Sequence, residues 1–166
     1  MAAATALRGV ALAVLVAACH HVPAESRWTS PSRCDTTSNT PLRRGALGAA
    51  NRDSLLREAQ VRRAAWRARN IKDYRIRVGV RCFCPFSPPA ILEVRGGIPV
   101  ALRDSTGPNA YTIEGLFDLI ERAGQNNELV DVSYDPCLGY PVSVRVDPKG
   151  LDNWYWVTAD HLTTPR

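Results

Sequence analysis

The sequence predicts an α+β fold: an antiparallel sheet with two helices, in the order α-β-β-β-α-β-β-β. Two segments carry apolar residues at the spacing of amphipathic helices. Other short runs alternate apolar and polar residues with the period of two that marks half-buried strands. Successive strands joined by turns pair antiparallel, and helices that are segregated from the strands are typical of α+β domains.

The chain of 166 residues fits one domain with extensions. We expect a signal peptide at residues 1–18, a lipidated flexible tether at 19–50, a single α+β domain at 51–160 and a tail at 161–166. The net charge is +5, and the basic residues are spread along the whole chain. A nucleic-acid footprint is concentrated on one face or stripe, so we expect no nucleic-acid partner.

The N-terminus predicts export and lipidation. Arg8 precedes an apolar run at residues 9–18, which is too short for a bilayer span of about 20 residues and is typical of a signal-peptide core. Val16-Ala17-Ala18-Cys19 resembles the bacterial lipobox, which implies a lipid on the Cys19 sulfur and cleavage after Ala18. We therefore expect an extracytoplasmic, membrane-anchored protein, at the inner face of the outer membrane if the host has two membranes. The alternative is a secreted protein with an incidental cysteine.

Residues 20–50 are rich in proline, serine and threonine and show no apolar periodicity, so we expect a flexible tether. Such a segment reaches roughly 30 Å. The first helix is expected at residues 52–69, with Asn51 or Asp53 as its N-cap. Its apolar face consists of Leu55, Ala59 and Trp66, with Leu56 at the edge.

The next segment, residues 74–84, alternates strictly and predicts a long strand with one buried face. The side chains expected to point inward are Tyr74, Ile76, Val78, Val80, Cys82 and Cys84, and those expected to point outward include Arg75, Arg77 and Arg81. Residues 91–95 and 98–103 predict a hairpin around Gly96 and Gly97, a pair suited to the positive φ angles of a tight turn.

Residues 113–123 give the clearest helical pattern, with Thr112 as the N-cap, Glu114 in the first turn and Gly124 as the expected end. Two further strands follow, at residues 130–134 and 142–146, joined by a loop that contains Cys137. The last strand is expected at residues 153–159. Trp154 and Trp156 lie in it, which indicates a strand covered on one side and partly exposed on the other.

Several short motifs occur together along the expected domain: Trp66 and Tyr74, Cys82-Phe83-Cys84, Gly96-Gly97, the run from Thr112 to Phe117, Tyr134-Asp135, Gly139-Tyr140-Pro141 and Val146-Asp147. Together they resemble an uncharacterised bacterial family of secreted and lipid-anchored proteins, domain of unknown function 6174. The resemblance covers residues 55–158. It implies the fold and the extracytoplasmic location, and it brings no activity.

With Cys19 lipidated, four cysteines remain: Cys34, Cys82, Cys84 and Cys137. An even number in an exported protein predicts disulfides. We expect Cys84–Cys137 together with Cys82–Cys34, and the alternative pairing is Cys82–Cys84. A redox-active Cys82/Cys84 pair is a further alternative. A zinc site built on these thiols lacks an evident fourth ligand, since His161 is the only histidine of the expected domain, so we expect no metal.

The sequence contains none of the familiar hydrolase, metalloprotease or phosphate-loop motifs, and we expect no cofactor and no catalytic residue. The outward arginines Arg75, Arg77 and Arg81, together with Trp154 and Trp156, form the expected binding surface. The partner would be an anionic envelope polymer or an envelope protein. The competing interpretation is that a helix or only solvent covers these arginines. The sequence thus favours a non-catalytic binding module, with a thiol-disulfide redox protein as the alternative.

Overall fold

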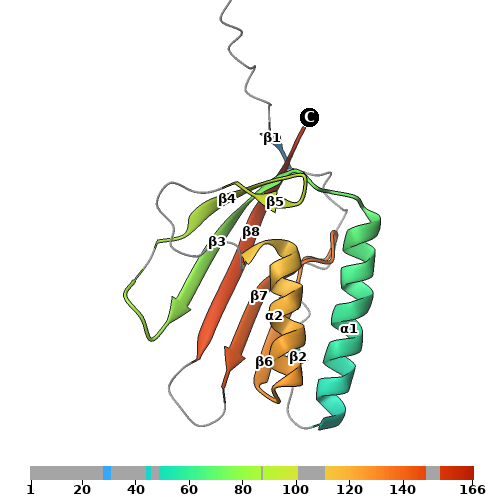
Figure 1. Ribbon diagram of the computed structural model, residues 1–166, viewed down its shortest axis with the longest axis vertical. Helices are drawn as coiled ribbons and strands as arrows, with labels where there is room; N and C mark the ends of the chain where they lie inside the picture. The colour runs from blue at the N-terminus through green and yellow to red at the C-terminus, as the bar shows by residue number, and fades with distance from the viewer. Residues whose placement is uncertain (1–27, 31–43, 46–48, 87, 101–110, 149–153) are drawn as a thin grey trace, which may run out of the picture.

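The computed structural model describes residues 28–30, 44–45, 49–86, 88–100, 111–148 and 154–166. They form one antiparallel sheet with two helices against one of its faces (Figure 1). The predicted α+β class and element order are confirmed, with short extra strands before the first helix. None of the helices in the described part of the chain is both long and apolar enough to cross a membrane.

The helices are α1 (Ala49–Ala68) and α2 (Ile113–Gln125), and the strands are β1 (Trp28–Thr29), β2 (Arg44–Gly45), β3 (Tyr74–Cys82), β4 (Ala90–Arg95), β5 (Ile98–Pro99), β6 (Leu129–Tyr134), β7 (Pro141–Asp147) and β8 (Tyr155–Pro165). The strand order is β2-β6-β7-β8-β3-β4-β5, and β1 pairs with β8. Strand β8 therefore joins the β3–β5 half of the sheet to the β6–β7 half, although it comes last in the sequence.

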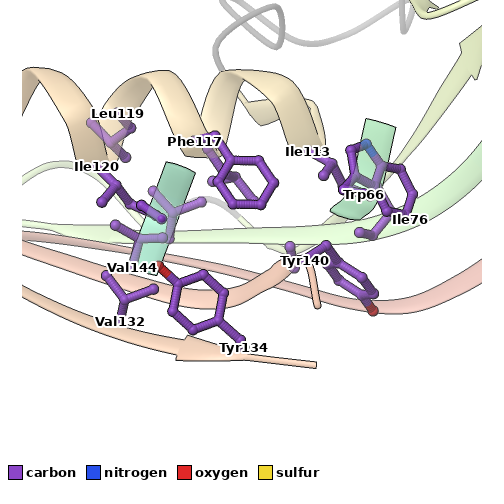
Figure 2. Close-up of a cluster of buried hydrophobic side chains, with 14 of the residues drawn as sticks. Trp66, Ile76, Ile113, Phe117, Leu119, Ile120, Val132, Tyr134, Tyr140 and Val144 are labelled. Carbon is purple, nitrogen blue, oxygen red and sulfur yellow. The ribbon is translucent and has the colours of Figure 1, made fainter. Parts of the chain in front are cut away.

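The side chains on the inner face of the sheet and the apolar side of α2 form the core. Figure 2 shows Ile113, Phe117 and Ile120 of α2 above Val132, Tyr134 and Val144 of the strands, with Trp66 of α1 closing one end. The Trp66 ring meets the edges of Tyr74 and Tyr140, each with 5.9 Å between ring centroids. The predicted inward pattern of β3 holds for Tyr74 and Ile76, which are buried.

Strand β8 is longer than the sequence predicts. Its register against β3 shifts between Arg77, which faces Asp160, and Arg75, which faces Thr163. The extra residue forms a β-bulge, and His161 within it has a φ of 54°. Pairing resumes beyond the bulge, so the prediction of a tail at residues 161–166 is wrong. A simple alternation cannot reveal this continuation, because the bulge breaks the period of two.

The expected tether at residues 19–50 needs a partial correction. Strand β1 pairs Trp28 with Pro165, and β2 pairs Arg44 with Val132, so two short pieces of this segment belong to the sheet. The signal peptide, Cys19 and Cys34 lie outside the described residues. The fold thus begins well before the first helix in sequence, through contacts with strands that are far away along the chain.

Gly124 does not end α2 as expected. The helix continues to Gln125, and beyond it the backbone N–H of Asn126 donates to the Arg122 carbonyl and that of Asn127 donates to the Gly124 carbonyl. Gly124 is buried, and a Cβ atom added to it would lie 2.7 Å from Cδ2 of Leu56. The glycine therefore allows α1 and α2 to approach each other closely.

Candidate binding surface

The face of the sheet turned away from the helices carries the predicted surface arginines. Arg77 and Arg81 are exposed and Arg75 is half-buried, while the helices pack on the opposite face (Figure 1). The interpretation in which a helix covers these arginines is therefore wrong. We call this side of the sheet the open face.

At one end of the open face, arginines flank a tryptophan on both sides. Trp156 of β8 is directly opposite Arg81 of β3 and Arg145 of β7. The guanidinium carbon of Arg81 lies 5.2 Å from the centre of the Trp156 ring, and that of Arg145 lies 5.4 Å from the centre of the Trp154 ring. A cation over a tryptophan face is held by the ring quadrupole. The Trp156 Nε1–H also donates to Ser143 Oγ at 2.7 Å, which fixes the ring on the sheet.

A second tryptophan–arginine cluster occupies the other end of the open face. The guanidinium carbons of Arg75 and Arg95 lie 4.4 and 4.7 Å from the centre of the Trp28 ring. The two carboxylate oxygens of Glu93 accept hydrogen bonds from Nε of Arg75 and Nε of Arg95, each at 2.7 Å. Burial opposes ionisation of Glu93, but these two hydrogen bonds outweigh it and keep its pKa below the usual value. Glu93 therefore neutralises one of the two positive charges of this cluster.

Between the two clusters the open face is lined by small or neutralised side chains. Arg77 donates from Nε and Nη2 to the two carboxylate oxygens of Asp160 at 2.7 and 2.9 Å, and this hydrogen bond lowers the Asp160 pKa. Gly79 faces Thr158, which faces Ser143 across the next strand. A Cβ on Gly79 would lie 2.8 Å from Thr158 Oγ1, so a larger residue would disturb this row.

The charge of the open face is therefore uneven. Arg75, Arg77 and Arg95 are paired with carboxylates. Within the described residues, Arg81 and Arg145 form no ion pair and contact tryptophan rings instead. The two arginines without an ion pair thus lie at the Trp156 end of the open face, Arg81 over the Trp156 ring and Arg145 over the Trp154 ring.

The structure joins Cys82 to Cys84, with 5.1 Å between their Cα atoms. The preferred pairings Cys84–Cys137 and Cys82–Cys34 are therefore both wrong, and the alternative pairing Cys82–Cys84 is the one present. Strand β3 ends at Cys82, and the chain bends there instead of continuing to Cys84 as predicted; this bend brings the two cysteines within bridging distance. Cys137 is also disulfide-bonded, and its partner is neither of these two.

A hollow of about 480 Å³ lies between α1 and the β6–β7 turn, and its lining includes Arg57, Val61, Arg62, Arg69 and Leu138. No group of three or more histidine, cysteine, aspartate or glutamate side chains in the described part of the chain is placed to hold a metal ion. The open face is thus the feature with the most distinctive chemistry.

The structure brings together Arg81, Trp154 and Trp156 of the predicted surface and places Arg75 at the opposite end of the open face. It adds Trp28, which the sequence reading assigned to the tether. In the sequence, the strand that carries Trp28 is marked only by a single Trp-Thr pair within a proline- and serine-rich segment. Trp28 lies in the site because β1 pairs with the far end of β8.

Neither the curated proteins nor the solved structures contain a match to this chain. The comparison with protein families gives one match, over residues 58–153, which runs from the middle of α1 to just before β8. This region includes β3, the C-x-C motif, α2 and the β6–β7 hairpin. The chain therefore belongs to the family of unknown function DUF6174.

Proposed function

We propose that this protein is a lipid-anchored, non-catalytic module of the bacterial cell envelope that binds an anionic polysaccharide through the open face of its sheet. The observation that carries the proposal is the placement of Trp156 between Arg81 and Arg145. Tryptophan rings offer a flat apolar surface against which the C–H face of a sugar ring can lie. Arginines that lack a carboxylate partner attract the carboxylate or phosphate groups of an acidic polymer.

The N-terminal sequence and the disulfides support the proposed location. The lipobox-like run before Cys19 supports lipidation and export, to the inner face of the outer membrane if there are two membranes. The Cys82–Cys84 disulfide and the disulfide at Cys137 are features of an oxidising compartment. A protein in the cell envelope is surrounded by anionic polymers. The arginines of the open face would therefore be exposed to such a polymer.

The test is a binding titration of the full chain with polyuronate oligosaccharides, using neutral dextran as the comparison ligand. We expect binding to polyuronate that weakens as salt is added, because exposed charges are screened. The variant R81A/R145A should bind about tenfold more weakly, and R57A/R122A, which removes the same charge from the exposed helix surfaces, should bind normally. Equal binding by both double variants would contradict the proposal.

A thiol-disulfide redox function is the second candidate, and the formed Cys82–Cys84 disulfide favours it. Cys84 is exposed and Cys82 is half-buried, so a small thiol can approach the pair from solvent. A redox protein would show a measurable reduction potential for this pair and would lose its function in C82S/C84S. A binding module with the same substitutions would still bind polyuronate.

A further inference from the structure

Two phenylalanines project from the connection between β3 and β4. Phe83 and Phe86 are 82% and 90% exposed, which makes them the most exposed of the large hydrophobic side chains in the described residues. Phe83 lies between the two bonded cysteines. In Figure 1 this connection lies beyond the ends of β3 and β4, on the side of the sheet away from the chain's C-terminus. We call residues 83–86 together with Pro88 and Pro89 the β3–β4 tip.

The backbone of the tip is unusually poor in hydrogen-bond donors. Pro85, Pro88 and Pro89 have no N–H group. A loop that enters the apolar part of a bilayer leaves its backbone donors without water, so each missing N–H lowers the barrier to insertion. The Cys82–Cys84 bond further restrains the tip before insertion. Both features suit a short apolar tip better than they suit a solvated loop.

The residues next to the tip have the chemistry of the membrane interface. Arg81 lies just before it in the sequence, and Trp156 lies opposite Arg81 at the same end of the sheet. Arg145 and Trp154 complete this end. Tryptophans are enriched at the level of lipid headgroups, and arginines there attract anionic headgroups. The apolar tip therefore suits the acyl-chain layer of an anionic bilayer. The tryptophans and arginines next to it suit the headgroup layer.

The anchor is long enough to allow the tip to touch the membrane that holds it. Cys19 precedes Trp28 by nine residues, a span of at most about 30 Å. Trp28 pairs with the end of β8, and the 11 residues of β8 extend about 36 Å from there toward the tip. The tip can therefore reach the same bilayer when the sheet is tilted toward it.

We propose that Phe83 and Phe86 insert into the acyl-chain layer of an anionic bilayer and set the orientation of the anchored domain. This inference rests on the lipid anchor of the proposed function, and it places Arg81 and Trp156, which the proposed function assigns to polymer binding, beside the headgroups of the bilayer. With the tip inserted and the sheet tilted, the Trp28 end of the open face stays farthest from the bilayer.

The test is photolabelling of the full chain on vesicles of phosphatidylglycerol and phosphatidylcholine that contain a phospholipid with a diazirine in its acyl chain. Trypsin releases residues 82–95 as one peptide, because Arg81 and Arg95 border it and the disulfide lies within it. It also releases residues 96–103, which carry Ile98, itself 70% exposed. We expect lipid adducts on residues 82–95 and few on residues 96–103.

The variant F83S/F86S should reduce the adducts on residues 82–95 about tenfold, since each phenylalanine contributes its full apolar area to insertion. The matched variant V61S/I98S removes two exposed aliphatic side chains elsewhere and should leave these adducts unchanged. Both variants alter exposed residues, and equal thermal unfolding midpoints confirm that they fold. Adducts that are equal on both peptides, or that are insensitive to F83S/F86S, would overturn the proposal.

Mass spectra of the labelled peptides, together with the polyuronate titration, separate this inference from the proposed function. The mass of the mature N-terminal peptide reports lipidation of Cys19, and the polyuronate titration reports binding by the open face. Labelling of the tip without polyuronate binding would leave the insertion standing and remove the proposed polymer partner. Polyuronate binding without labelling of the tip would do the reverse.

Discussion

Trp156 and Arg81 lie side by side across β8 and β3, with the Arg81 guanidinium carbon 5.2 Å from the centre of the Trp156 ring. Arg145 faces Trp156 from the other neighbouring strand. The strand order produces this arrangement, because β8 inserts between β3 and β7 although these strands are far apart in the sequence. The proposed binding surface thus depends on β8, the last strand of the described chain.

The Tyr74 hydroxyl connects β3 to the start of α2 by accepting a hydrogen bond from the Ile113 N–H at 3.1 Å. We expect Tyr74→Phe to lower the free energy of unfolding by about 1–3 kcal/mol, because the buried N–H loses its acceptor. Tyr134→Phe is the matched control, since the Tyr134 hydroxyl is buried and has no hydrogen-bond partner in the described structure. Urea denaturation should show little change for Tyr134→Phe. Equal losses in both variants would contradict this reading.

Arg63 joins α1 to α2 through three carboxylates. It binds Glu114 at 2.9 Å, Asp118 at 2.6 Å and Glu121 at 3.0 Å, and its side chain is 14% exposed. We expect Arg63→Met to reduce the free energy of unfolding by about 1–3 kcal/mol, because three neighbouring carboxylates lose their shared cation. Arg67→Met should cost less than about 1 kcal/mol, since the Arg67 side chain is 59% exposed. Chemical denaturation of both variants checks the difference.

The same network predicts an acid-sensitive contribution to stability. Burial opposes ionisation of Glu114, but hydrogen bonds from Arg67 and Arg63 outweigh it and keep its pKa below the usual 4.5. A lowered folded-state pKa contributes stability above the unfolded pKa, and this contribution is lost as the pH falls through the folded value. We therefore expect the stability difference between the wild type and Glu114→Gln to shrink below about pH 4. A difference that stays constant down to pH 2 would contradict the network's role.

The disulfide arrangement predicts a specific peptide map. Digestion without reduction should release residues 82–95 with both cysteines oxidised, 2 Da lighter than the reduced peptide and resistant to alkylation. Since Cys19 is expected to carry lipid, Cys137 should appear linked to the peptide that contains Cys34. The variant C82S/C84S should lose only about 1.5 kcal/mol of stability, because the loop that the bond closes is short. A Cys84–Cys137 crosslink would contradict the structure.

Local patterns predicted most of the core. The apolar spacing of residues 113–123 placed Phe117 and Ile120 toward the sheet, and the alternation around Val132 and Val144 placed these residues inward, as the structure has them. These features depend only on neighbours along the chain, and burial of one face enforces them. The same alternation identified Arg75, Arg77 and Arg81 as outward side chains.

The features that the sequence did not reveal depend on long-range pairing or on local breaks in period. Trp28 joins the open face through a strand pair between the two ends of the chain. The bulge at His161 breaks the alternation of β8, so its last residues do not show a strand pattern. Cys82 can pair with Cys84 because β3 ends at Cys82 and the backbone bends there. The alternation of residues along the strand does not show this bend.

The most direct test of the open face as a binding surface is the indole N–H spectrum of the ¹⁵N-labelled full chain in neutral detergent, recorded with increasing polyuronate. The chain has four tryptophans, and three of them, Trp28, Trp154 and Trp156, have their rings stacked with the arginines of this surface. We predict that the Trp156 resonance shifts most, since its ring lies between Arg81 and Arg145, and that the resonance of Trp66, which is 3% exposed in the core, stays in place. An unchanged Trp156 resonance at saturating polyuronate would contradict the account.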